Sequence, residues 1–229
     1  MFPCDGRNQT AAIEKFFWDE EKGAYIDSFT SGKRNVTRHA NIFAILFDIA
    51  DKQKQEKILT NVLENDEIPA ITTPYFNFFE LDVLCQMGKL TEVLDKIRSY
   101  WGGMLDLGAV TFWEEYDPSV PKEEQYDMYG DHFGKSLCHA WAASPIYFLA
   151  KYFAGLDLVN KDGVTYVLKP QMQYFTDLDC TLPVGSDGTV RLVWDGECLE
   201  VTADAEGGVL ELGEEKISLV RGETRRVKI

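Results

Sequence analysis

Six helical segments that alternate between charged and apolar character constrain the fold more than any other feature of this sequence. The amphipathic segments are residues 8–19, 54–65 and 90–101, and the segments apolar on nearly all sides are residues 37–52, 72–89 and 136–153. A helix that is apolar all round is buried, and an amphipathic helix covers it from outside. The alternation therefore predicts helical hairpins in an inner and an outer layer, as in an α/α toroid. Three hairpins form only part of such a ring.

After Gly155 the sequence changes to short segments in which apolar and polar residues alternate with a period of two. Four such segments are "GVTYVLKP", "TVRLVWDG", "CLEVTADA" and "GVLELGEEKISLVRG". With the glycine and aspartate turns between them, they predict a small antiparallel β-sandwich. We therefore expect a mainly α protein of two domains. Residues 1–157 form the helical domain, and residues 158–229 form the C-terminal β-sandwich.

The charge of the chain excludes one class of partner. Its 229 residues include 38 acidic and 23 basic side chains, which give a formal net charge of -15. An acidic surface repels phosphate backbones, so we expect no nucleic-acid partner. No apolar run reaches membrane-spanning length, so we expect no membrane partner either.

The cysteines and histidines show no pattern typical of a metal or disulfide framework. The five cysteines contain no CxxC pair and read as free thiols of a reducing compartment: Cys4, Cys85, Cys138, Cys180 and Cys198. The three histidines lack metal-ligand spacing, so we expect neither a metal nor a cofactor: His39, His132 and His139. The first residues lack the basic and apolar regions of a signal peptide. A cytoplasmic location is therefore favoured, unless further sequence precedes Met1.

The predicted N-termini of the three apolar helices share polar and aromatic residues. Inner helices of successive hairpins run in the same direction, so these ends should gather at one mouth. The residues concerned are Thr37, Arg38, His39, Asn41, Thr72, Thr73, Tyr75, Asn77, Ser136, His139 and Trp141. Helix dipoles and free backbone N–H groups favour anions and hydroxyl-rich ligands at such ends.

The long connection over residues 108–135 should enter the same mouth, because it leads into the last apolar helix. Its aromatic and polar side chains are Trp113, Glu114, Glu115, Asp117, Tyr126, Tyr129, Asp131 and His132. A loop of this length within a compact domain is usually functional or disordered. Aromatic rings beside carboxylates suit sugars, because the rings stack on C–H faces and the acids bind hydroxyls or catalyse.

The stretch "TFWEEYDPS" contains the strongest catalytic candidate. Adjacent residues of an extended segment point in different directions, so Glu114 and Glu115 are not expected to share one task. Burial of a carboxylate after two aromatic residues is costly unless it has a partner. Glu114 is therefore the candidate, and Glu115 reads as a loop charge. Trp141 and His139 each fit two interpretations, a core residue or a ligand contact.

Two stretches of the sequence resemble a known family. "YWGGMLDLGAVTFWEEYDP", followed by "YGDHFGKSLCHAWAASPIYFLAKYFAGL", resembles the C-terminal half of the catalytic domain of bacterial α-L-rhamnosidases, glycoside hydrolase family 78. "VTRHAN" and "TTPYFNFFELDVL" are similar to the same family. The resemblance covers roughly residues 8–156 and extends weakly through the β-rich end, similar to the family's C-terminal sandwich. It implies a six-hairpin (α/α)6 toroid, of which this chain holds three hairpins.

The resemblance also implies an activity and a set of site residues. The family removes terminal α-L-rhamnosyl groups with inversion, and the Glu after the Trp of a "T-x-W-E" stretch is its general base, which matches Glu114. His139 matches a histidine that contacts the sugar, and Trp113, Trp101 and Trp141 match aromatic positions that line the pocket. Glu115 stands where many members of the family have Arg. The resemblance therefore does not assign a role to Glu115.

The general acid has no counterpart in this chain. In the family it lies in the first half of the barrel, which is missing here, so we expect a C-terminal portion of the enzyme, inactive in isolation. Its expected partners are a rhamnosyl-containing oligosaccharide or glycoside, and either the missing barrel half or another copy of the chain. Two alternatives stay open: a non-catalytic sugar-binding remnant, and a structural helical module in which Trp113 and Trp141 belong to the core.

Overall fold

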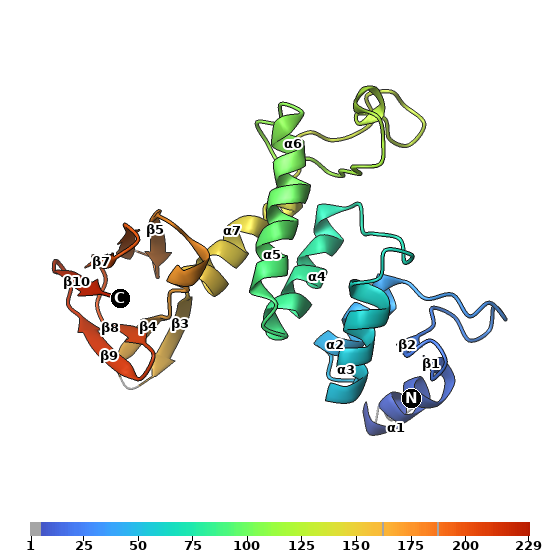
Figure 1. Cartoon of the computed structure of the whole chain (residues 1–229), viewed down its shortest axis with the longest axis horizontal. Helices are drawn as coiled ribbons and strands as arrows, with labels where there is room; N and C mark the ends of the chain where they lie inside the picture. The colour runs from blue at the N-terminus through green and yellow to red at the C-terminus, as the bar shows by residue number, and fades with distance from the viewer. Residues whose placement is uncertain (1–5, 162, 187) are drawn as a thin grey trace. The chain divides into compact units, whose positions relative to one another are not determined.

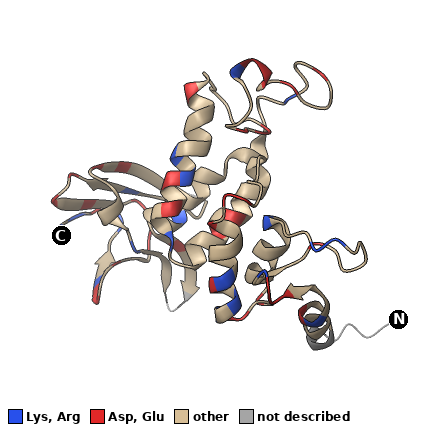
Figure 2. Ribbon diagram, turned by 45° about the vertical axis from the view of Figure 1, so that its right-hand side comes forward, with Lys and Arg blue, Asp and Glu red and all other residues tan. Residues whose placement is uncertain are grey.

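The computed structural model describes residues 6–161, 163–186 and 188–229. The chain divides into two compact units, Met1–Ala142 and Ala143–Ile229, and each is described by itself (Figure 1). Acidic and basic residues are spread over the elements of both units rather than gathered on one element (Figure 2). Four cysteines are free thiols, and Cys4 lies outside the described residues. No described helix is both long and apolar enough to cross a membrane.

The first unit opens with a helix and a small hairpin. Helix α1 (Gly6–Phe17) leads into strands β1 (Trp18–Asp19) and β2 (Ala24–Tyr25), which pair antiparallel. Asn41 of helix α2 (Arg38–Leu46) is fully buried, and its side chain binds the backbone of β2. Its side chain accepts from the Tyr25 backbone N–H at 2.8 Å and donates to the Tyr25 carbonyl at 2.9 Å. The hairpin was not predicted, because two-residue strands are too short to show a period.

The next helices follow the predicted order. Helix α3 (Lys52–Ile58) continues as a π-helical turn (Leu59–Leu63), and α4 (Pro74–Gln86) has its proline in the first turn. There the missing N–H costs no hydrogen bond. Helix α5 (Leu90–Lys96) continues through a π-helical turn (Ile97–Trp101) into α6 (Gly102–Asp106). Helices α2 and α5 both pack against α4.

A buried ionic cluster ties these three helices together. Arg38 of α2 donates to Glu80 of α4 at 2.9 Å and to the Leu63 carbonyl at 2.8 Å. Lys96 of α5 donates to the same Glu80 oxygen at 2.5 Å. Burial lowers the pKa of the Lys96 ammonium, and the attraction of Glu80 opposes that shift. Arg38 is therefore buried between the packed helices. It does not face an open mouth at the helix N-termini, as the sequence predicted it would.

The sixth predicted helix is shorter than expected. Residues 136–139 are not helical; a 3-10 turn (Ala140–Ala142) follows, and helix α7 (Ser144–Phe148) begins only then. Pro145 lies in the first turn of α7, which continues as a π-helical turn (Leu149–Phe153). A proline in the first turn of a helix loses no hydrogen bond, so Pro145 is compatible with a helix that begins at Ser144. His139 and Trp141 therefore precede the helix, and their placement on it was wrong.

The second unit contains two four-stranded sheets. One has the order β10-β7-β6-β5 and is antiparallel throughout, and the other has the order β3-β4-β8-β9. The strands are β3 (Leu156–Lys161), β4 (Val164–Leu168), β5 (Leu178–Val184), β6 (Gly188–Trp194), β7 (Cys198–Ala203), β8 (Gly208–Leu212), β9 (Glu215–Leu219) and β10 (Thr224–Lys228). Both sheets bury side chains in one shared core, among them Leu168 and Leu210 from one sheet and Leu192 and Leu199 from the other.

One pair of strands departs from the predicted antiparallel arrangement. β4 and β8 are parallel, with Val167 opposite Val209. The chain leaves β4, forms three strands of the other sheet and returns as β8, and such a crossover permits parallel pairing. The strands begin at Leu156, close to the predicted boundary at 157/158, whereas the compact units meet between Ala142 and Ala143. The helical segment Ser144–Phe153 therefore belongs to the unit that holds the sheets.

The described residues combine helices with three β-sheets. The closure of the hairpins into a toroid stays a prediction.

Candidate functional site

Two segments distant in sequence pair along their backbones and build the candidate site in the first unit. The Glu114 N–H donates to the Ser136 carbonyl at 2.9 Å, and the His139 N–H donates to the Phe112 carbonyl at 2.8 Å. The Thr111 hydroxyl donates to the Leu137 carbonyl. This pairing uses backbone groups that a helix over residues 136–139 would need. It also brings the side chains of Glu114 and His139 to one place.

The Glu114 carboxylate is buried, with 8% of the residue exposed, and it has partners on both oxygens. Oε2 accepts from the Ser136 backbone N–H at 3.0 Å, and Oε1 accepts from the Tyr129 hydroxyl at 3.1 Å. The His139 Nδ1 atom lies 3.9 Å from Oε2. Hydrogen bonds donated to a carboxylate favour its ionised form. The cost of burial that singled out Glu114 in the sequence is therefore offset by these partners.

Tyr129 reaches Glu114 from a tight turn at the tip of the long loop. Met128 and Asp131 exchange backbone hydrogen bonds of 3.0 and 2.9 Å across Tyr129 and Gly130. Both central residues have positive φ, 55° and 81°, as in a type I′ turn. Positive φ strains the backbone of a tyrosine, whereas glycine adopts it without a steric clash. The Glu114 hydrogen bond, followed by its negative charge, raises the pKa of the Tyr129 hydroxyl.

Lys135, next to Ser136 in the chain, is a buried cation close to the site. Burial lowers the pKa of its ammonium, and the surrounding carboxylates oppose that shift, Glu115 most strongly and then Asp117. Neither Lys135 nor the Tyr129 hydrogen bond was predicted from the sequence. The "YG" pair of residues 129 and 130 was the available signal for the turn, because positive φ favours glycine.

An exposed row of stacked rings leads away from Glu114. The His139 and Trp141 rings lie 4.2 Å apart with planes 32° from parallel, and the Trp141 and Tyr75 rings lie 5.0 Å apart at 36°. Trp141 is 46% exposed, which does not fit the core interpretation. Tyr75 is exposed to the same extent. Both rings are therefore accessible to a ligand.

The two other tryptophans predicted to line the pocket, Trp101 and Trp113, are buried. Trp113 packs edge-to-face on Tyr126 with ring centroids 5.7 Å apart. Trp101 donates its indole N–H to the Ala142 carbonyl at 2.9 Å. Trp101 and Trp113 thus belong to the packed interior of the first unit. Their contact with a sugar stays a prediction.

Glu115 has a different partner from Glu114. It is half-buried, and its Oε1 accepts from the Thr72 hydroxyl at 2.8 Å. The two adjacent carboxylates therefore face different surroundings, as the sequence predicted.

The polar residues at the predicted helix N-termini divide into two groups. Asn41 and Asn77 are fully buried, and Asn77 donates to the Ile71 carbonyl at 3.0 Å. With Arg38, they stabilise the fold. His39 is exposed, and its ring contacts Phe76 in a tilted arrangement with centroids 4.1 Å apart. In the described part of the chain, no group of three or more His, Cys, Asp or Glu residues is placed to hold a metal ion.

Residues 2–153 match the model of the bacterial α-L-rhamnosidase six-hairpin glycosidase domain. Among solved structures, a rhamnosidase from Klebsiella oxytoca with rhamnose bound is similar at 31% identity and a TM-score of 0.56, over 64% of this chain and 27% of that one. The α-L-rhamnosidase from Dictyoglumus thermophilum is similar in fold, at 18% identity and a TM-score of 0.61, over 96% of this chain and 26% of that one. The chain thus spans about a quarter of either structure's length. No curated protein matches it.

Proposed function

The chain belongs to the bacterial α-L-rhamnosidase six-hairpin glycosidase family, and from this premise we propose that it carries the general base of an inverting hydrolase for terminal α-L-rhamnosyl groups. Glycoside-hydrolase chemistry is the common property of the family and of its solved relatives. The finer proposal concerns Glu114. It rests on one observation, a buried carboxylate with two donors and a histidine beside exposed aromatic rings.

In the proposed reaction, the ionised Glu114 accepts a proton from a water molecule as the water oxygen bonds to the anomeric carbon. The bond from that carbon to the leaving oxygen breaks, and the leaving oxygen takes a proton from a general acid on the opposite side of the sugar. The Ser136 N–H and the Tyr129 hydroxyl donate to the two carboxylate oxygens and hold the carboxylate in place. In this proposal, His139 and Trp141, whose rings lie 4.2 Å apart, contact the sugar ring.

The general acid is proposed to come from outside the residues of this chain. Inversion requires two carboxyl groups about 6.5–9.5 Å apart with room for a water molecule. Glu115 is the sequence neighbour of Glu114 and is bound to Thr72, so it does not lie across a sugar from it. The acid would therefore be supplied by a further polypeptide segment, such as the other half of a six-hairpin toroid, or by a second copy.

A sugar-binding role without hydrolysis is the second candidate. It is favoured by the accessible rings of Trp141 and Tyr75 together with the lack of an assigned acid. Under this alternative, the chain binds rhamnose but releases no product from an aryl rhamnoside.

The first experiment compares Glu114→Gln with the parent sequence in a preparation that hydrolyses 4-nitrophenyl α-L-rhamnopyranoside. Loss of the base is expected to lower kcat by about 10²–10⁴-fold with little change in KM. Glu123→Gln, an exposed carboxylate of the same loop, is the matched control and should keep full turnover. Near-normal turnover of Glu114→Gln would remove Glu114 from the role.

The second experiment follows the anomer released and the binding of the sugar. Proton NMR of early product should show the β-anomer of rhamnose, because inversion converts the α-linkage. A first-formed α-anomer would overturn the inverting mechanism. If calorimetry detects rhamnose binding by the chain but no preparation hydrolyses the aryl rhamnoside, the sugar-binding alternative replaces the hydrolase.

A further inference from the structure

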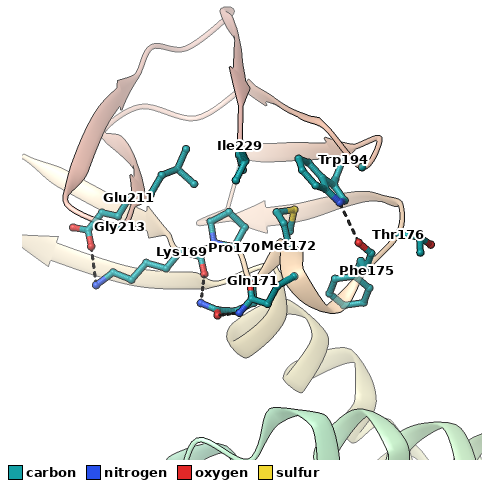
Figure 3. Close-up of a pocket in the computed structure, with 13 residues that line it drawn as sticks. Lys169, Pro170, Gln171, Met172, Phe175, Thr176, Trp194, Glu211, Gly213 and Ile229 are labelled. Atoms are coloured by element: carbon teal, nitrogen blue, oxygen red, sulfur yellow. Dashed lines mark hydrogen bonds and ion pairs between the residues drawn. The ribbon is translucent and has the colours of Figure 1, made fainter.

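The second unit contains a cleft that the proposed function does not use. It has a volume of about 1010 Å³ and lies at one end of the two sheets, where β6 and β8 end (Figure 3). Residues 169–176, which connect the two sheets, form one side of it. Binding clefts for small molecules typically measure about 300–1,000 Å³. This cleft therefore has room for a ligand of at least two sugar rings.

The floor of the cleft is apolar and firmly held. Met172 and Trp194 are buried there, and Phe175 is half-buried beside them. The Trp194 indole N–H donates to the Phe175 carbonyl at 3.1 Å, which fixes the ring (Figure 3). The floor is therefore pre-formed, and an apolar ring face would gain contact area without reorganising it.

The rim is polar, and the two charged side chains among its lining residues are paired with each other. The Lys169 ammonium and a Glu211 carboxylate oxygen lie 2.8 Å apart, so the two charges of the rim are paired. Lys216 also reaches Glu211, at 2.8 Å, from outside the lining. An anion would have to compete with Glu211 for Lys169, and a cation would have to compete with Lys169 for Glu211. A neutral ligand avoids both costs.

The remaining rim groups are suited to hydroxyls. The Gln173 amide donates to the Gln171 side-chain oxygen at 2.9 Å, and Gln171 donates to the Lys169 carbonyl at 3.2 Å. Gln173 is exposed and uses its amide nitrogen in this chain of hydrogen bonds. Its side-chain oxygen can therefore accept a hydrogen bond from a ligand. Thr176, beside Phe175 at the end of the same segment, adds a hydroxyl that donates to Asp177 and whose oxygen is an acceptor (Figure 3).

From this combination we propose that the cleft is a saccharide-binding site of the second unit, separate from Glu114. A saccharide has apolar C–H faces for the floor and neutral hydroxyls for the amides and Thr176. The cleft binds a neutral sugar of two or more rings. It would hold part of a glycoside or oligosaccharide near the protein without taking part in bond cleavage.

The test uses the full chain labelled with ¹⁵N and titrated with rutinose, a neutral rhamnosyl-glucose disaccharide. Saturable shifts are expected at the Trp194 indole N–H and at the side-chain amides of Gln171 and Gln173. The resonances are assigned by triple-resonance spectra, so no variant of the buried Trp194 is needed. Inorganic phosphate should leave these signals unchanged.

A matched pair of variants distinguishes recognition of the sugar by the rim amides from an effect common to the loss of any exposed amide. Gln173→Ala should weaken rutinose binding at the Trp194 signal about fivefold, the effect of one lost hydrogen bond. Gln86→Ala removes an equally exposed amide with a single side-chain hydrogen bond, to Asp82 on α4, and should leave binding unchanged. Trp141→Ala, which alters the candidate rhamnoside site, should also leave the Trp194 response intact. This variant distinguishes failure of one site from failure of the other.

Three outcomes would overturn the proposal. The first is an absence of saturable shifts at Trp194 with rutinose at millimolar concentrations. The second is a response to phosphate without one to rutinose, which would indicate an anion site. The third is equal weakening by Gln173→Ala and Gln86→Ala, which would show that the rim amides do not recognise the sugar.

Discussion

At the scale of single residues, two neighbouring glutamates show how local geometry separates roles. Glu114 faces Tyr129 and the Ser136 backbone, whereas Glu115 faces Thr72. Successive side chains of an extended segment point to opposite sides, so this separation follows from their adjacency. The chemistry of Glu114 therefore depends on partners that are distant in sequence.

The hydrogen bond between Tyr129 and Glu114 leads to a prediction about titration. A negative carboxylate beside a phenol opposes loss of the phenol proton, and this raises the pKa of Tyr129. In Glu114→Gln the charge is absent, so the pKa of Tyr129 should fall towards its ordinary value near 10. With ¹³C-labelled tyrosine, NMR would follow the midpoint of this one phenol as the pH is raised. Deprotonation should begin at a lower pH in the variant than in the parent.

The control for this titration is Glu123→Gln, which neutralises an exposed carboxylate of the same loop. It should leave the Tyr129 midpoint unchanged. Tyr129→Phe identifies the signal, because the corresponding resonance disappears. A Tyr129 midpoint equal in the parent and in Glu114→Gln would contradict the contact.

The sequence identified Glu114 but not what surrounds it. The aromatic residues before Glu114 and the cost of burying a carboxylate are local signals, which a single stretch displays. Tyr129 and Ser136 lie 15 and 22 residues away, and only the backbone pairing of residues 111–114 with 136–139 brings them into contact. Contacts between residues so far apart produce no periodic pattern in the sequence. The sequence therefore singled out Glu114 as a candidate whose role stays a prediction, and it gave no signal for the partners of Glu114.

At the scale of elements, a buried ionic cluster joins α2, α4 and α5. Glu80 receives both Arg38 and Lys96 on one oxygen, and all three lie within the packed helices. Breaking a buried ion pair by removal of one partner is costly, because the remaining charge loses its compensation. The cluster therefore holds the helical unit together and makes its packing sensitive to one carboxylate.

Glu80→Gln should consequently destabilise the helical unit. The neutral amide leaves two buried cations close together, and we expect a loss of about 3 kcal/mol in the free energy of unfolding. Urea unfolding followed by helical circular dichroism would show a lower midpoint with an unchanged slope. Glu92→Gln, on the surface of α5 beside Lys89, is the control and should change stability by less than about 0.5 kcal/mol. Equal effects of the two variants would contradict a structural role for the cluster.

Three strands of the second unit that the sequence missed share a position in their sheets. Strands β3, β5 and β10 all lie at sheet edges, where one side of the strand has no neighbour. β10 reads "TRRVK" and β5 contains Pro183, and charges and proline are tolerated at edges. β10 lacks the apolar alternation that revealed the central strands, whereas β5 alternates but contains a proline. The central strands β6, β7 and β8 were predicted because their inward side chains must be buried.

At the scale of the whole molecule, the first unit carries a connected aromatic face. It consists of His39, Phe43, Phe47, Tyr75, Phe76, Phe79 and Trp141. Its rings form one connected series from Trp141, beside the candidate site, to Phe47, which is 68% exposed. Contiguous apolar patches of this kind mark interaction surfaces. Coverage by another polypeptide would serve both the packing of these rings and the supply of a general acid.

We expect the isolated chain to self-associate through this aromatic face. The weight-average mass in sedimentation or light scattering should rise with concentration above the 26.0 kDa of one chain. Phe47→Gln removes an exposed ring without changing charge, and burial of one such ring contributes about 1.5–3 kcal/mol, so association should weaken at least about tenfold. Val110→Gln is the matched control, because Val110 is 94% exposed and belongs to no such series. A monodisperse monomer at every concentration would contradict the partial-toroid interpretation, since faces that a closed ring buries would then be stable in water.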